Sequence, residues 1–197
     1  MIETRVLTGA ALAAALEDVA RLRIEVFRDW PYLYDGDQAY ERTYLQAYRD
    51  SARAILVGAY DGARLVGAST GAPLGDHAVD LAAAFAGQAM ALEEVFYCAE
   101  SVLLSSYRSQ GIGHRFFDLR EAHARRMGYV WSAFCAVERP ADHPDRPKAY
   151  RPLDTFWTAR GYRPLSGAVA SFSWKDLGQA AETAKPLQFW IRRLEEA

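Results

Sequence analysis

The sequence predicts a single domain of mixed α and β structure, in which helices flank one continuous sheet. Three observations lead to this class. Two β-rich runs over 54–70 flank Asp61-Gly62, a strong two-residue turn signal. The run over 11–30 repeats apolar residues at helical spacing. No internal repeat or interdomain linker interrupts the 197 residues, so we expect one domain over 1–197.

The expected elements alternate along the chain. A short alternating segment at 3–8 predicts a first strand. The first helix should end before Pro31, because the residue preceding a proline is disfavoured in the helical region. Further helices are expected over 38–50, over 77–94, from about 112, and over 152–160 before Gly161. Further strands are expected over 95–104, 129–137, 169–177 and 186–194, the last two paired.

The bulk composition excludes several classes of function. The chain carries 23 basic and 25 acidic residues, whereas domains that bind the phosphate backbone of nucleic acids are usually basic, so no nucleic-acid partner is expected. Cys98 and Cys135 lie in apolar runs and suggest buried thiols in a reducing compartment rather than a disulfide or metal site. The chain has neither a secretory signal at its start nor a bilayer-spanning apolar run, so we expect a cytoplasmic protein without a membrane partner.

The segment 105–129 carries the strongest functional signal. An arginine and two glycines, Arg108, Gly111 and Gly113, precede a helical run. Free backbone N–H groups at a helix start favour an anion, and glycine lets a phosphate approach the main chain. A P-loop is excluded because His114 follows Gly113, and the dinucleotide pattern lacks its third glycine.

The stretch "RSQGIG" at 108–113 matches [QR]-x-x-G-x-[GA], the pyrophosphate loop of the GNAT acyltransferase superfamily. The alternative is a plain helix-start turn. The chain also resembles this superfamily in the strand before the loop, the helix after it and the run 154–162, which is similar to F-Y-x-x-x-G-[FY]. The resemblance implies a central mixed, mostly antiparallel twisted sheet flanked by helices. Its parallel strands 94–104 and 129–137 would splay apart to form the CoA cleft.

The resemblance also implies acetyl-CoA as cosubstrate, no metal, and direct acyl transfer to an amine without a covalent enzyme intermediate. The pantetheine arm would run along Leu103, Leu104 and Ser105, with the Leu103 N–H polarising the thioester carbonyl. The pyrophosphate would rest on the amides of the loop and helix start: Arg108, Ser109, Gln110, Gly111, Ile112, Gly113 and His114.

The proton chemistry points to a carboxylate, because an ammonium cannot attack until it loses a proton. Glu100 is the first candidate and Glu94 the reserve, although Glu100 could instead be an ion-paired strand residue. The usual family tyrosine is replaced by Trp157, which could wall the pantetheine site. Tyr150 or Tyr107 could then protonate the leaving thiolate, or it leaves unassisted.

The acceptor site is expected on the first two helices and their loop, with Trp30, Tyr32 and Tyr34 as binding residues. A tyrosine stripe at positions 40, 44 and 48 follows, of which at least one should be core. His123 is expected on a helix surface and His143 in a solvated loop.

The function implied is N-acetylation of a primary amine on a small molecule or peptide, in a cytoplasmic acetyl-CoA-dependent acyltransferase. The alternative is a catalytically weak module that binds or senses acyl-CoA. The terminal strands leave a homodimer open.

Overall fold

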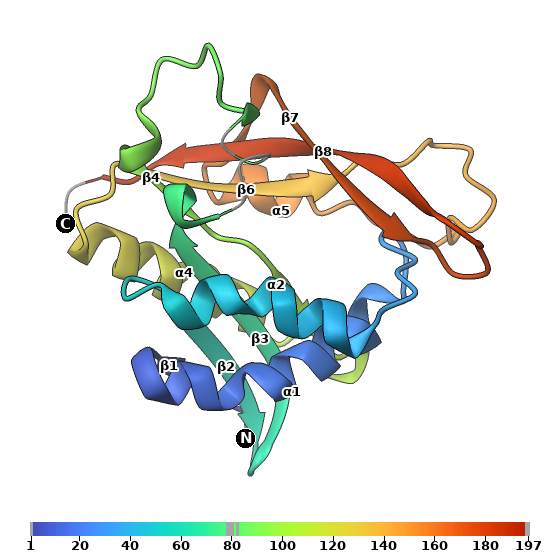
Figure 1. The fold of residues 1–197 in the computed structure, drawn as a ribbon, viewed down its shortest axis with the longest axis horizontal. Coiled ribbons are helices and arrows are strands. Elements are labelled where there is room, and N and C mark those ends of the chain that lie inside the picture. Colours follow the sequence, from blue (N-terminus) through green and yellow to red (C-terminus); the bar gives the residue numbers. More distant parts are fainter. Residues whose placement is uncertain (1, 78–80, 82, 196–197) are drawn as a thin grey trace.

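The fold is seen in a computed structural model that describes residues 2–77, 81 and 83–195 (Figure 1). An eight-stranded sheet runs in the order β1-β2-β3-β4-β6-β8-β7, and β5 pairs with β3 beside this path. The β4–β6 pair is parallel and the other pairs are antiparallel. The strands span Glu3–Leu7, Ile55–Asp61, Arg64–Pro73, Val95–Tyr97, Ser101–Leu103, Trp131–Val137, Arg163–Lys175 and Glu182–Arg193, from β1 to β8.

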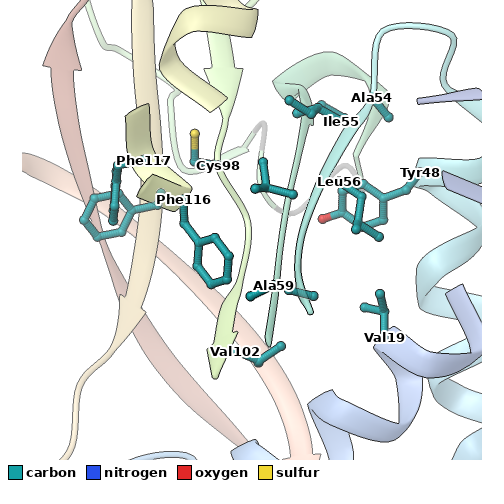
Figure 2. Close-up of a cluster of buried hydrophobic side chains, with 14 of the residues drawn as sticks. Val19, Tyr48, Ala54, Ile55, Leu56, Ala59, Cys98, Val102, Phe116 and Phe117 are labelled. Carbon is teal, nitrogen blue, oxygen red and sulfur yellow. The ribbon is translucent and has the colours of Figure 1, made fainter. Parts of the chain in front are cut away.

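Helices cover both faces of this sheet. They span Gly9–Phe27 (α1), Gln38–Asp50 (α2), Ile112–Arg126 (α4) and Asp154–Ala159 (α5). Figure 2 shows Phe116 and Phe117 of α4 on one side of the central strands, with Val19 of α1 and Tyr48 of α2 on the other. All four side chains are buried, so the central strands lie between two apolar layers.

Local sequence accounts for the clearest boundaries. The α2 helix begins where Asp37 caps it, because its carboxylate accepts from the amides of Ala39 and Tyr40 at 2.9 Å. The β2–β3 hairpin turns at Gly62, whose φ of +60° is costly for other residues. Both elements confirm the sequence-based expectation.

The loop between α1 and α2 rises to meet the β7–β8 hairpin (Figure 1). Tyr34 bridges to Asp176, and the Leu177 amide donates to the Leu33 carbonyl at 2.7 Å. This contact closes one wall of the site described below.

Two expectations need correction. The strand expected over 95–104 is broken into β4 and β5. Of the helix expected over 77–94, residues 78–80 and 82 lie outside the described residues. The described residues Leu81 and Ala83 are helical, but 84–87 form a turn with Gly87 at a φ of +81°, 89–90 form a bend, and 92–94 form a single 3-10 turn, η2. A positive φ cannot continue a right-handed helix. Among the described residues, no helix combines the length and apolarity needed to cross a bilayer.

Candidate active site

A parallel strand pair that opens partway along its length forms the centre of the site. β4 and β6 are in register from Val95↔Trp131 to Tyr97↔Ala133. The Cys98 amide then donates to the Ala133 carbonyl at 2.7 Å. Beyond that bond β5 pairs with β3 while β6 stays with β8, so the two strands diverge into a split.

A β-bulge causes this divergence. The Thr70 carbonyl accepts from the Ala99 amide at 3.1 Å, and the Thr70 amide donates to the Glu100 carbonyl at 3.2 Å. Ala99 and Glu100 therefore both lie opposite the single residue Thr70 of β3, and such a bulge bends the strand that contains the extra residue. The buried Arg120 of α4 donates to the Thr70 and Glu100 carbonyls at 3.0 and 3.1 Å and so holds the bulge from the opposite face.

The Leu103 main chain faces into the split. The Leu104 amide donates to the Val66 carbonyl at 3.0 Å, and the Thr70 amide donates to the Glu100 carbonyl, so residues 100 and 104 make ladder hydrogen bonds to β3. Leu103, paired with Gly67, is a non-bonded position between them, and its N–H and C=O point away from β3. Leu104 is different, because its amide and carbonyl are both used within the chain, the latter by Tyr107. Leu103 therefore offers a free donor in the split and Leu104 does not.

The glycine loop presents a run of free amides at the start of α4. Gly111 caps the helix with a φ of +78°, and the first helical bond runs from the Arg115 amide to the Gly111 carbonyl at 3.2 Å. No main-chain carbonyl among the described residues accepts from the amides of 109–114. The Arg108 guanidinium lies beside the loop, donating to the Leu103 carbonyl at 3.2 Å. Amides and arginine together favour an anion here.

A cavity of about 580 Å³ adjoins the split on the α1–α2 side of the sheet. It reaches the split at Ala99 and Cys135 and is closed by the β7–β8 hairpin. Eight of its nineteen lining residues are aromatic: Phe27, Tyr32, Tyr34, Tyr40, Tyr44, Tyr97, Phe172 and Trp174. This volume lies within the range of about 300–1,000 Å³ usual for small-molecule sites.

Glu100 borders the cavity and is also ion-paired, as the alternative interpretation of its sequence position expected. One carboxylate oxygen accepts from Thr70 Oγ1 at 2.8 Å. The other accepts from Arg23 at 2.8 Å and from the Tyr44 hydroxyl at 3.2 Å. Arg23 also binds the fully buried Glu41. Burial alone would lower the pKa of Arg23, but Glu100, Tyr44 and Glu41 raise it well above its ordinary value.

Several lining residues were not anticipated from the sequence, among them His77 and Cys135. His77 makes edge-on contacts with Tyr48 and Tyr97, with ring centroids 5.2 and 5.0 Å away, and burial lowers its pKa to about 4. It is therefore neutral near pH 7. Burial raises the pKa of the Cys135 thiol to about 12, so this side chain is not a thiolate nucleophile.

The expected acceptor residues separate into two groups. Tyr32 and Tyr34 line the cavity, whereas Trp30 lies outside the lining found among the described residues. Trp30 packs against His143 and Tyr150, with centroids 5.1 and 5.9 Å away. In the tyrosine stripe, Tyr40 and Tyr44 line the cavity and Tyr48 is core.

The remaining expected residues also have definite positions. Glu94 is exposed in η2, before β4 begins, and does not border the cavity. The Tyr107 hydroxyl donates to Asp61 at 2.8 Å. Trp157 packs on Phe134 and Trp190, with centroids 5.0 and 5.1 Å away.

Two histidines of α4 lie away from the cavity. His114 lies at the helix start, with its ring 4.8 Å from that of Phe156. The surface position expected for His123 is wrong: it is buried and its Nε2 lies 2.9 Å from the Arg53 carbonyl. Local helical spacing could not reveal that this face of α4 is covered.

Comparison with known proteins gives a consistent result. The described residues contain no cluster of three or more His, Cys, Asp or Glu side chains suited to a metal ion. A sequence model described as the Acetyltransferase (GNAT) family matches residues 16–146. No curated protein matches the sequence significantly.

Solved structures of similar fold span nearly the whole chain. An N-acetyltransferase from Staphylococcus aureus Mu50 has a TM-score of 0.59 at 8% identity, covering 98% of this chain and 99% of that one. The ribosomal-protein-alanine N-acetyltransferase of Brucella melitensis has a TM-score of 0.58 at 13% identity, covering 98% and 99%. The yncA protein of Salmonella typhimurium, solved with its cofactor acetyl-CoA, has a TM-score of 0.56 at 12% identity, covering 100% and 95%. With the family match over residues 16–146, the chain belongs to the GNAT family of acetyltransferases.

Proposed function

We propose that this acetyltransferase moves the acetyl group of acetyl-CoA onto a primary amine held in the aromatic cavity. The observation that carries the proposal is the free Leu103 N–H in the split, directly beside a cavity that Glu100 borders. A carboxylate for the amine proton thus lies in the bulge, and a donor for the carbonyl oxygen lies three residues after it.

The residues of the chain fit acetyl-CoA on two counts. The unpaired amides of 109–114 suit the pyrophosphate, and the outward main chain of Leu103 suits the pantetheine arm. Trp157, whose indole packs on Phe134 of β6, is our proposed apolar wall for the pantetheine arm. When bound, acetyl-CoA supplies the thioester carbonyl carbon that the amine nitrogen attacks.

Three groups of the protein then act on the reaction. The Leu103 N–H donates to the oxygen that gains negative charge, as an oxyanion donor does. Glu100 takes the proton that the ammonium must lose before attack. The aromatic lining excludes water around the amine. Because the Cys135 thiol stays protonated, we propose direct transfer to the amine rather than an acetyl-cysteine.

The leaving thiolate needs a proton or must depart without one. Tyr150 is our proposed donor, since the Tyr107 hydroxyl already donates to Asp61. Burial raises the pKa of Tyr150, so its hydroxyl stays protonated near neutral pH.

The second candidate is a module that binds acyl-CoA with little turnover. Two observations favour it: Trp157 occupies the usual tyrosine position, and Arg23 and Thr70 already occupy the Glu100 oxygens. Release of free CoA thiol from acetyl-CoA, measured with a panel of primary amines, separates the two. Amine-dependent release supports the transferase, and tight acetyl-CoA binding with no release on any amine overturns it.

We also propose a cytoplasmic location, which the two buried free thiols of Cys98 and Cys135 support. β1 and β7 lie at the two edges of the sheet path, which leaves the terminal strands free to pair in a homodimer. Light scattering at several protein concentrations tests the dimer, and a constant monomer mass excludes it.

A further inference from the structure

The cavity lining carries information about the acceptor, given the proposed function on which this inference rests. From its aromatic walls and its charges, we infer that the acceptor is a monocationic amine on a flat apolar body, of the arylalkylamine type. Polyamines and peptide amines are the competing classes within the same reaction.

The walls favour an apolar body. Eight aromatic rings are joined by aliphatic side chains, including Leu81 and Leu187, on the lining. Aromatic faces attract both other rings and cations, with centroid separations of about 4.5–7 Å for rings and about 6 Å for cations. The cavity already holds two cation–ring contacts, because the Arg23 guanidinium carbon lies 4.1 Å from the centroid of Tyr44 and 5.0 Å from that of Phe27.

The charges favour a single positive group. Arg23 contacts two buried carboxylates, Glu41 and Glu100, so this cluster has one negative charge more than positive. A second buried arginine, Arg120, binds the Glu100 carbonyl from the opposite face of the sheet and does not border the cavity. An unbalanced buried charge is unfavourable, and one ammonium restores neutrality.

One corner of the cavity is polar. The hydroxyl of Tyr34, a lining residue that is 8% exposed, and Glu41 Oε1, which lies behind the lining, make no hydrogen bond of ordinary length among the described residues, and neither does Nε2 of the lining residue His77. Burial raises the pKa of Tyr34, and Glu41 raises it further through its charge and hydrogen bonding, so Glu41 and Tyr34 lie close together in this corner of a largely apolar chamber.

The neighbouring cations belong to a second cluster. Behind Trp174, Lys185 and Arg139 both bind Asp176. Lys185 also donates to Thr183 and to the Trp174 carbonyl, and Arg139 to the carbonyls of residues 31 and 32. The donors of Lys185 and Arg139 are therefore committed to groups other than Glu41 and Glu100.

Proton transfer from a monocationic amine to Glu100 keeps the cavity neutral. One ammonium and the three charged side chains sum to zero before the step. When the N–H bond breaks and the proton joins Glu100, the amine becomes neutral and Arg23 with Glu41 still sum to zero. A polyamine would leave further positive charges in the aromatic chamber, and a peptide would leave its amide groups there with few partners.

The test measures binding and turnover separately. Binding of 2-phenylethylamine is titrated calorimetrically against the protein saturated with CoA, which contains no acetyl group to transfer. The neutral isostere 2-phenylethanol and the triamine spermidine are titrated alongside, with glycylglycine amide as the peptide. Thiol release with acetyl-CoA is then measured for the three amines.

We expect 2-phenylethylamine to bind at least about tenfold more tightly than 2-phenylethanol, the order of one cation–π contact with a charge partner. Glu41→Gln should remove most of this difference, and Tyr34→Phe should reduce it with the cavity shape preserved. Glu17→Gln is the matched control, because Glu17 forms an exposed ion pair with Arg42 across the same two helices.

Equal binding of the amine and the alcohol overturns the inference. So does a higher kcat/KM for spermidine or the dipeptide amide than for 2-phenylethylamine. If no amine releases thiol, the proposed function fails, and the calorimetric comparison still decides the chemistry that the cavity recognises.

Discussion

Replacing Glu100 with glutamine tests the proposed mechanism most directly. The carboxylate accepts from Thr70, Arg23 and Tyr44. Glutamine keeps one carbonyl oxygen for Arg23 and Tyr44, and its amide can donate to the Thr70 hydroxyl, so no buried group loses its partner. Arg23 retains Glu41. We therefore expect a stability loss of only about 1 kcal/mol, as charged hydrogen bonds become neutral ones.

The rate should fall far more than the stability. Loss of a positioned base costs about 10²–10⁴ in rate, which corresponds to about 3–5 kcal/mol in the activation barrier. Binding of acetyl-CoA should persist, because the main-chain amides that we propose for it lie outside the Glu100 cluster. With no base, the variant depends on amine already deprotonated in solution. Its rate should therefore rise about tenfold per pH unit toward the amine pKa of about 10.4.

The assay is thiol release at saturating acetyl-CoA from pH 7 to pH 10, with melting temperature measured on the same samples. Glu94→Gln is the control, since Glu94 is exposed and does not border the cavity. A Glu100→Gln variant that keeps the wild-type rate at pH 7 refutes the reasoning. The proton would then leave by another route, with the neutral His77 or a water chain as the first alternatives.

Three further outcomes are expected. Gly111→Val should raise the KM for acetyl-CoA, because a side chain in the loop blocks the approach of the pyrophosphate. Gly128→Val is the control: its φ of +81° imposes a similar strain of about 1–2 kcal/mol, but it should change stability alone. Equal KM values for the two variants would remove the loop from the cofactor site. Burial lowers the pKa of His77 from 6.5 to about 4, so between these pH values the unfolded chain binds a proton that the folded chain does not, and the free energy of unfolding falls as pH drops from 6.5 to 4. In denaturant titrations, His77→Gln should remove up to about 3 kcal/mol of that fall. An unchanged pH dependence would contradict the assignment. Arg139→Met breaks the buried pair with Asp176, at 2.8 and 2.9 Å, and the hydrogen bonds to the loop after α1. The melting temperature should therefore drop, and the KM for the amine should rise more than the KM for acetyl-CoA. A parallel rise in both KM values would make Arg139 purely structural.

The sequence predicted those features that depend on neighbouring residues. The helix over 38–50, the Asp61-Gly62 turn and the glycine loop are local signals, and each lies where its pattern indicated. The family resemblance correctly predicted the mixed sheet with one parallel pair. Among site residues, Tyr32 and Tyr34 line a cavity, as a rigid aromatic loop beside the acceptor would.

The features that were missed depend on residues far apart in sequence. Arg23 and Glu100 are 77 positions apart, and nothing in either local pattern indicates that they meet. His77 begins the run 77–94, whose composition predicted one long helix that the structure does not form. Its position between Tyr48 and Tyr97 arises only from folding. Glu94 and Glu100 are only six residues apart in the sequence, yet Glu100 lies buried at the cavity while Glu94 is exposed to solvent.

The bulge at Ala99 and Glu100 links the two halves of the site. It ends the pairing of β4 with β6, which opens the split and frees the Leu103 N–H. It also places the Glu100 carboxylate against Arg23 at the cavity. Arg120 holds this irregularity with a buried guanidinium whose partners among the described residues are neutral oxygens, those of residues 70, 100, 101 and 116. Such a buried charge is costly, and a regular strand would not need it. The chain thus maintains, at some cost in stability, a distortion that brings the proposed oxyanion donor and the proposed proton acceptor into neighbouring positions.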